Sequence, residues 1–181
     1  RVIVSPLIPC LNCNYCSAGY FNSCNNLNEI GSSINGGFAD YINIPQNNIL
    51  INGIIPIENN IRDDEASLIE PLSCCLNAHL NFNIPINDEF VIIIGDGPIG
   101  LIHLQISKLY GAKTIVVGKI PSRLKEAKSI GADVALLNND PEESIKTICD
   151  YSYGKGGKLV IVATSNPEAI DLALKVAGKN S

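Results

Sequence analysis

The chain has 181 residues, of which 46% are hydrophobic and 17% charged, and its formal net charge is −5 at pH 7. This acidic balance, with Lys and Arg scattered along the chain, argues against a nucleic-acid-binding face or a polybasic membrane anchor. No apolar run approaches the roughly 20 residues of a transmembrane helix, so we expect neither nucleic acid nor membrane as a partner. The seven cysteines fit a reducing cytoplasm. Because the chain has no methionine and opens inside an apolar segment, we expect it to be an internal piece of a longer protein.

The first third of the chain is predicted to consist of short strands and loops, with an extended segment over residues 38–44. From residue 63 a helix is predicted, with Asp63 or Asp64 as its cap and a body over residues 66–79. Pro71 lies inside this helix. We expect a kink or a restart there, because proline cannot donate the helical hydrogen bond.

Four cysteines in the first third have the spacing of a metal site. They follow a C-x2-C-x2-C-x7-C pattern among loop-forming residues: Cys10, Cys13, Cys16 and Cys24. Two-residue gaps let a short loop direct several thiolates to one centre, and a fourth cysteine closes a tetrahedron. Because all four positions are filled, the predicted zinc is structural. The alternative, a disulfide pair or unrelated buried thiols, is disfavoured by the spacing.

From residue 89, apolar strands alternate with helices. Strands are predicted over residues 90–94, 114–117, 134–137 and 159–163, and helices over 98–110, 122–130, 140–149 and from 166 onward. Ser122 and Asp140 are expected to cap two of these helices, and Gly111 and Gly131 to end two of them. This alternation predicts an α/β fold with a parallel sheet, right-handed crossovers and helices on both faces.

A glycine-rich turn joins the first of these strands to its helix. Gly95, Gly97 and Gly100 form a G-x-G-x-x-G pattern, and Pro98 and Ile99 open the helix. Such glycines permit a tight turn, let the backbone approach a pyrophosphate and let the helix pack closely on the strand. A turn without a ligand is the alternative. The strand–turn–helix context and the three units that follow favour a dinucleotide held at the helix N-terminus.

The end of the second predicted strand bears on the choice between NAD and NADP. An NAD site usually has Asp or Glu there, about 20 residues past the glycines, to bind the ribose 2′-hydroxyl. Here the region reads Gly118, Lys119 and, four residues later, Arg123, with no acid among residues 116–123. Because cations favour a 2′-phosphate, the sequence favours NADP over NAD. The alternative is a surface Lys and Arg beside an NAD that other contacts hold.

The order of the motifs resembles the zinc-dependent medium-chain dehydrogenases, and within them the polyol (sorbitol-like) and threonine dehydrogenase branch. The four-cysteine loop is followed by Gly-Gly-Phe-Ala-Asp-Tyr over residues 36–41, Glu-Pro-Leu over 70–72 and Gly-Asp-Gly-Pro-Ile-Gly over 95–100. The resemblance implies a partial GroES-like β domain over residues 1–62, a connecting helical segment over 63–88 and a partial Rossmann domain over 89–181.

By this resemblance the protein is a zinc-dependent oxidoreductase that interconverts a secondary alcohol and its ketone by hydride transfer to NAD(P), with a polyol, sugar alcohol or amino alcohol as substrate. A second, catalytic zinc would polarise the alcohol. Glu70 matches the acid that ligates this zinc or holds its water, and the other ligands would lie outside the chain. The alternative is a surface Glu near a helix N-terminus. Ile99, Gly118, Arg123 and Thr164 match positions near the dinucleotide.

The resemblance further implies a cytoplasmic homo-oligomer, a dimer or tetramer, and we expect this piece alone to be inactive. His79 and His103 lie in apolar helices and are expected to be packed side chains rather than metal ligands. A non-catalytic, zinc-stapled nucleotide-binding module, acting as a redox sensor or regulator, remains an alternative. A zinc-ribbon nucleic-acid binder is excluded by the charge and by the lack of interleaved basic and aromatic residues.

Overall fold

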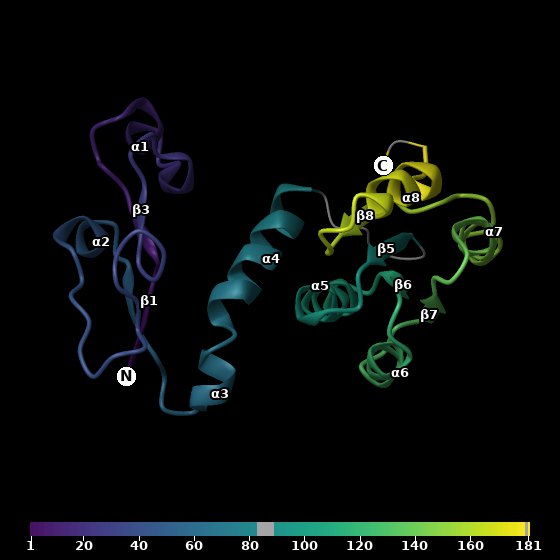
Figure 1. Ribbon diagram of the computed structural model, residues 1–181, viewed down its shortest axis with the longest axis horizontal. Coiled ribbons are helices and arrows are strands. Elements are labelled where there is room, and N and C mark those ends of the chain that lie inside the picture. The colour runs from purple at the N-terminus through teal and green to yellow at the C-terminus, as the bar shows by residue number, and fades with distance from the viewer. Residues whose placement is uncertain (83–88, 180) are drawn as a thin grey trace. The chain divides into compact units, whose positions relative to one another are not determined.

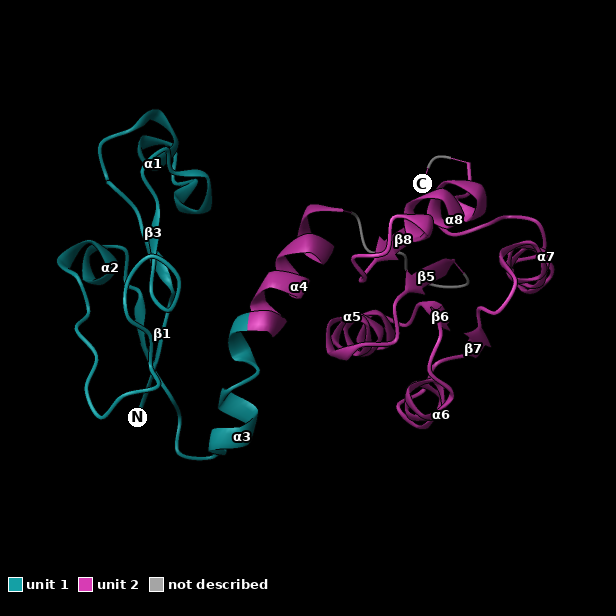
Figure 2. Ribbon diagram, viewed as in Figure 1, with its two compact units in different colours: residues 1–70 teal, residues 71–181 magenta. Residues whose placement is uncertain are grey.

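The computed structural model describes residues 1–82, 89–179 and 181 of the chain, and its elements are labelled in Figure 1. The chain divides into two compact units, Arg1–Glu70 and Pro71–Ser181 (Figure 2). This division falls inside the segment predicted to connect two domains, and the predicted boundaries at residues 62 and 88 stay predictions. In the described part of the chain, the helices are too short or too polar to cross a membrane.

The first unit contains two small antiparallel pairs of strands and four short helical segments. Its strands are β1 (Val2–Val4), β2 (Leu7–Ile8), β3 (Asn28–Glu29) and β4 (Ile54–Pro56), and its helical segments are α1 (Asn14–Ser17), η1 (Phe21–Ser23), α2 (Gln46–Leu50) and α3 (Asp63–Ala66). The strand β1 pairs with β4, and β2 pairs with β3. Asn48 ties α2 to the β2 region, since its buried amide donates to the carbonyls of Ser5 (2.7 Å) and Leu7 (2.9 Å).

Two predictions for the first unit need correction. Residues 37–40 form bends, and the segment 38–44 pairs with no strand among the described residues, so its Phe38 and Tyr41 side chains are exposed. An extended segment becomes a strand only when its backbone groups have a partner. The cap of α3 is Arg62 rather than Asp63 or Asp64, because the Glu65 carboxylate accepts the Arg62 N–H at 2.9 Å.

The predicted helical break near Pro71 is present at residues 67–68, and the second helix begins two residues before the proline. The helix α3 ends at Ala66, and α4 (Ile69–Asn81) places Pro71 in its first turn, where a missing N–H leaves no helical hydrogen bond unmade. Within the second unit, α4 packs on α5 (Pro98–Leu109) through Cys75, Ile102 and Ile106.

The second unit is a four-stranded parallel sheet in the order β7-β6-β5-β8 with helices on both faces, as Figure 1 shows. The strands are β5 (Phe90–Ile94), β6 (Lys113–Gly118), β7 (Val134–Leu137) and β8 (Leu159–Val162). The crossover helices are α5, α6 (Pro121–Ser129) and α7 (Pro141–Tyr151), and α8 (Glu168–Val176) follows β8. The predicted α/β fold with a Rossmann-type sheet is confirmed, and each strand lies within one residue of its predicted bounds.

Alternation along the central strands separates the core into two layers. Ile92 of β5 faces a cluster that includes Ile148 of α7 and Leu172 of α8. Ile93, the next residue, faces a second cluster that includes Leu104 of α5. Because successive side chains of a strand point to opposite faces, a continuous apolar strand such as β5 is buried on both sides.

The helix ends of this unit follow local chemistry with one exception. Asp140 caps α7 as predicted and accepts the Glu142 N–H at 2.9 Å. Gly111 and Gly131 end α5 and α6 with φ of 78° and 107°. The prediction that Ser122 caps α6 is wrong: the helix begins at Pro121 after Ile120, and no side chain at the N-cap bonds to it.

Candidate functional site

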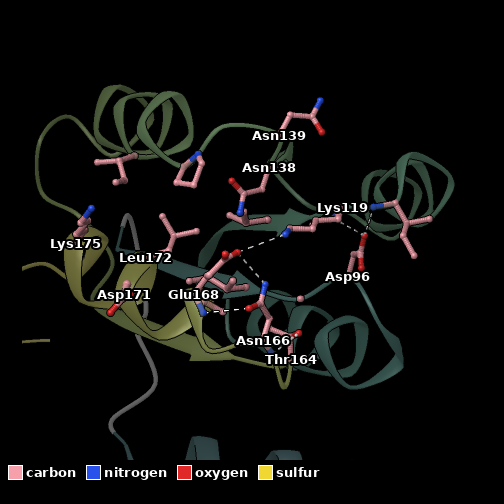
Figure 3. Close-up of a pocket in the computed structure, with 18 residues that line it drawn as sticks. Asp96, Lys119, Asn138, Asn139, Thr164, Asn166, Glu168, Asp171, Leu172 and Lys175 are labelled. Carbon is pink, nitrogen blue, oxygen red and sulfur yellow. Dashed lines mark hydrogen bonds and ion pairs between the residues drawn. The ribbon is translucent and has the colours of Figure 1, made fainter.

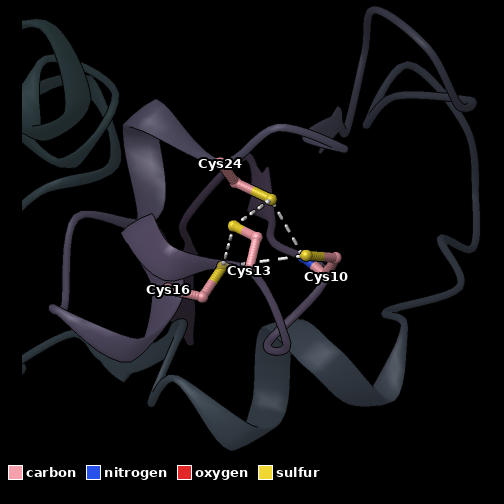
Figure 4. Close-up of side chains that lie close together, drawn as sticks. All are labelled: Cys10, Cys13, Cys16 and Cys24. Atoms are coloured by element: carbon pink, nitrogen blue, oxygen red, sulfur yellow. Dashed lines mark hydrogen bonds between the residues drawn. The ribbon is translucent and has the colours of Figure 1, made fainter.

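The four predicted metal-binding cysteines converge in the first unit (Figure 4). The Sγ atom of Cys13 lies 3.5 Å from that of Cys16 and 3.9 Å from that of Cys24, and the Cys10 and Cys16 sulfurs are 4.0 Å apart. All four ligand atoms lie within 4.8 Å of one another. A tetrahedral zinc with Zn–S bonds of about 2.3 Å sets its sulfurs about 3.8 Å apart. The cluster therefore has the dimensions of a four-thiolate zinc site.

Backbone N–H groups around the cluster favour thiolates. Cys24 Sγ accepts the N–H of Cys10 at 3.2 Å and of Asn26 at 3.3 Å. The N–H of Cys16, followed by that of Asn25, lowers the pKa of Cys13 to about 6, whereas burial raises the pKa of Cys16 to about 12. A divalent cation would let all four sulfurs ionise together, so the donor set fits zinc.

The turn between the first two ligands is strained. Leu11 has φ of 64°, a conformation that costs a non-glycine residue free energy and persists where the surroundings enforce it. This turn directs Cys10 and Cys13 toward one point. Its strain is consistent with a loop whose geometry a metal ion would hold.

The glycine-rich turn in the second unit has the geometry that its sequence predicts. Gly95 has φ of 130°, and a Cβ there would lie 2.5 Å from the Ala163 carbonyl oxygen. A Cβ at Gly100 would collide with the Gly95 carbonyl oxygen, so α5 packs closely on the turn. A Cβ at Gly97, the N-cap of α5, would meet nothing within 4 Å. The backbone at Gly97 is thus open to a ligand, and this cradle fits a pyrophosphate.

A pocket of about 540 Å³ lies at the carboxyl ends of the parallel strands (Figure 3). Four of the predicted dinucleotide residues line it: Gly95, Gly118, Lys119 and Thr164. The other five, Gly97, Pro98, Ile99, Gly100 and Arg123, are not among its lining residues. In an open parallel sheet, ligands bind outside the carboxyl ends of the strands where crossovers diverge to opposite faces, and β5 is the strand at which they diverge here.

Three carboxylates line the pocket, and the site residues predicted from the sequence include none of them: Asp96, Glu168 and Asp171. Asp96 Oδ2 accepts the N–H groups of Lys119 (3.1 Å) and Ile120 (2.8 Å). Across the pocket, Glu168 Oε2 lies 3.8 Å from the Lys119 Nζ, as the dashed line in Figure 3 shows. The second position of a G-x-G-x-x-G turn is variable, so the pattern assigns no role to Asp96. The feature of the sequence that could have indicated a role for Asp96 is its charge, since the rest of the turn is apolar.

Glu70, the predicted ligand of a catalytic zinc, is an exposed residue in the first turn of α4. Among the described residues, the four-cysteine cluster is the one group of three or more His, Cys, Asp or Glu side chains close enough to hold a metal. The role of Glu70 therefore stays a prediction.

The two histidines form a buried pair instead of a metal site. His79 Nε2 of α4 lies 3.0 Å from His103 Nδ1 of α5, and both side chains are buried. Burial and, secondarily, the His103 charge lower the pKa of His79 to about 4, and burial lowers that of His103. Their burial, with 1% of His79 and 7% of His103 exposed, confirms the expectation that they are packed side chains.

Each of the two units matches the model of a known protein family. Residues 1–55 match the family model of the alcohol dehydrogenase GroES-like domain, and residues 98–180 match that of the zinc-binding dehydrogenase. The chain belongs to the zinc-dependent medium-chain dehydrogenases. The first unit therefore corresponds to part of the GroES-like domain and the second to part of the Rossmann domain of this family.

Curated medium-chain dehydrogenases match nearly the whole chain. It is 32% identical over 171 residues to the L-threonine 3-dehydrogenase of Symbiobacterium thermophilum, covering 94% of this chain and 46% of that protein. It is 32% identical over 178 residues to the galactitol 1-phosphate 5-dehydrogenase of Escherichia coli K12, covering 97% and 49%. The chain thus spans about half the length of the relatives it matches. Neither relative supports the non-catalytic alternative.

Solved structures of the family agree with the fold and carry either nicotinamide cofactor. An alcohol dehydrogenase (rspB) from Escherichia coli CFT073, complexed with NADH, superposes with a TM-score of 0.86 at 31% identity and covers 100% of this chain and 52% of that one. A zinc-binding dehydrogenase from Sinorhizobium meliloti 1021, bound to NADP, superposes with a TM-score of 0.87 at 27% identity and the same coverage. Similarity alone does not choose between the cofactors.

Proposed function

We propose that this protein is a zinc-dependent oxidoreductase that interconverts a secondary alcohol and its ketone by hydride transfer to a nicotinamide dinucleotide. One observation supports the proposal above all. In a chain of this family, four cysteine sulfurs are spaced as in a zinc site, and a glycine-rich turn lies beside a pocket. Relatives named for threonine, galactitol 1-phosphate and D-arabitol phosphate support an amino alcohol, sugar alcohol or polyol as substrate.

The four cysteines would hold a structural zinc. Because they supply four sulfur ligands, such a zinc has no position left for water or substrate and takes no part in the reaction. Its contribution is to folding, since it joins Cys10 to Cys24 across a loop with little regular structure.

The dinucleotide would lie along the carboxyl ends of the strands. The open backbone at Gly97 and the first turn of α5 would receive the pyrophosphate. The end of β6 at Gly118 and Lys119 lies on the adenosine side in such folds, and Thr164 after β8 lies toward the nicotinamide side.

Glu70 is our candidate residue at a second zinc, which would supply Lewis-acid polarisation of the substrate alcohol when bound. Its support is the Glu-Pro-Leu segment and the family to which the chain belongs. Glu70 would hold either this metal or its water, and the remaining ligands would lie outside the chain. A cytoplasmic homo-oligomer, dimer or tetramer, likewise stays a prediction.

Two measurements test the proposal. The 181-residue chain should bind one zinc per molecule, measured by elemental analysis, and show no dehydrogenase activity with polyols and either cofactor. The full-length protein should oxidise one or more of threonine, galactitol 1-phosphate and sorbitol. A full-length protein that holds zinc and nucleotide but turns over no alcohol would refute the enzymatic function. Turnover by the 181-residue chain would contradict our placing of the missing zinc ligands.

A further inference from the structure

The carboxylate that an NAD site usually has at the end of its second strand is absent from residues 116–123. The structure nevertheless brings a carboxylate to this place from a different part of the chain. Asp96, the second residue of the glycine-rich turn, bonds through Oδ2 to the N–H groups of Lys119 (3.1 Å) and Ile120 (2.8 Å), the two residues directly after β6. Figure 3 shows these bonds at the edge of the pocket.

The position of this carboxylate is well defined. Only 10% of the Asp96 side chain is exposed, and the Gly95 N–H donates to the Val117 carbonyl at 2.8 Å, which joins the turn to the end of β6. Gly118 makes the room for it, because a Cβ at residue 118 would collide with the Asp96 carboxylate. Asp96, in the turn after β5, and Gly118, at the end of the neighbouring strand β6, thus form a sterically matched pair.

The second oxygen of Asp96 is available to a ligand. Among the described residues it accepts no hydrogen bond, and its nearest cation is the Arg123 guanidinium, whose Nη1 lies 3.9 Å from Oδ1. Asp96 also lines the pocket. A ribose hydroxyl can donate to such an oxygen, and a hydrogen bond to a charged acceptor is stronger than one between neutral groups.

The two cations that favour NADP in the sequence both have carboxylate neighbours in the structure. Arg123 lies beside Asp96, and Lys119 Nζ lies 3.8 Å from the Glu168 carboxylate. A 2′-phosphate bound here would meet the nearly buried charge of Asp96, and like charges repel more strongly where water is excluded. The local charge therefore favours a hydroxyl over a phosphate.

We infer that Asp96 is a specificity-determining residue that binds the adenosine ribose, and that it makes the protein select NAD(H) over NADP(H). This inference rests on the proposed dinucleotide function and reverses the cofactor preference that Lys119 and Arg123 indicate in the sequence. In this protein Asp96, at the variable position of the glycine-rich turn, would bind the ribose hydroxyl that an acid at the end of the second strand usually binds.

The test compares NADH and NADPH binding to the full-length, zinc-loaded protein by the increase in nicotinamide fluorescence, without substrate. We expect NADH to bind at least about tenfold more tightly, the ratio that one charge-assisted hydrogen bond sustains. In Asp96→Asn the amide oxygen can still accept the backbone N–H groups while the charge is lost, and the ratio should fall to about one or reverse. Asp171→Asn removes a charge from the same pocket without altering the carboxylate neighbours of Lys119 and Arg123, and it should leave the ratio unchanged.

Each other outcome is decisive. Tighter binding of NADPH by the unmodified protein overturns the inference and leaves the dinucleotide function intact, whereas binding of neither nucleotide overturns both. An unchanged ratio in a folded Asp96→Asn variant, or an equal shift in Asp171→Asn, overturns the role of Asp96. If Asp96→Asn does not fold, Arg123→Gln is tested in its place. The inference expects this variant still to bind NADH more tightly than NADPH. A loss of NADPH affinity alone would show that Arg123 binds a 2′-phosphate, which contradicts the inference.

Discussion

The buried histidine pair makes the stability of the second unit depend on pH. The pKa of His79 is lowered to about 4 by burial and by His103, against an ordinary value of about 6.5. As the pH falls below 6.5, His79 therefore becomes protonated in the unfolded chain while it stays neutral in the folded chain. This pair contributes its full stability above pH 6.5 and loses it between pH 6.5 and 4.

The size of this loss follows from the pKa difference. One pKa unit corresponds to about 1.4 kcal/mol, so protonation of His79 costs the folded state on the order of 3 kcal/mol by pH 4. The lowered pKa of His103 acts in the same direction. These are the only two histidines of the chain, so no third imidazole complicates the titration.

The assay is urea unfolding followed by far-ultraviolet circular dichroism between pH 7.5 and 4.5 with zinc present. The double variant His79→Leu, His103→Leu removes both titrating groups and leaves no buried ring nitrogen unpaired. We expect the unmodified chain to lose stability below pH 6.5 relative to the double variant. A difference between the two chains that stays constant to within about 0.5 kcal/mol over this range would refute the reasoning.

Three further predictions concern the metal and cofactor residues. Cys24→Ser should lose bound zinc in elemental analysis and several kcal/mol of unfolding free energy, whereas Cys149→Ser, outside the cluster, should keep its zinc. Gly95→Ala should destabilise the chain by about 2 kcal/mol or more because of its positive φ and the Ala163 contact. Gly97→Ala should stay within about 1 kcal/mol in stability but weaken NADH binding, and an equal loss of stability in both glycine variants would contradict this. Glu70→Gln should lower kcat of the full-length protein by about tenfold or more without changing the zinc held by the cysteines; an unchanged kcat would remove Glu70 from the catalytic site.

Local patterns were enough to predict most of the second unit and the metal cluster. The strand β5 is a continuous apolar run, and its burial on both faces follows from that run alone. The four cysteines lie within 15 residues, so their spacing already restricts their geometry. The glycine cradle is local for the same reason, since Gly95 and Gly100 belong to one turn.

Features that depend on distant parts of the chain could not be predicted in this way. The Asp96 carboxylate, 24 residues before Ile120, accepts the N–H groups of the two residues that directly precede α6, where a Ser122 cap was expected. The pairing of His79 with His103 joins two side chains from different helices that are likewise 24 residues apart in the sequence. No periodicity or spacing within either segment indicates these contacts.

The steric relation between residues 96 and 118 has a consequence for how such a chain could have evolved. Any side chain at position 118 would collide with the Asp96 carboxylate, whereas glycine at 118 is compatible with a smaller residue at 96. The order in which residues 96 and 118 are substituted therefore matters. The aspartate can therefore be acquired without steric conflict where residue 118 is glycine, and a larger residue at 118 conflicts with it while the aspartate is present.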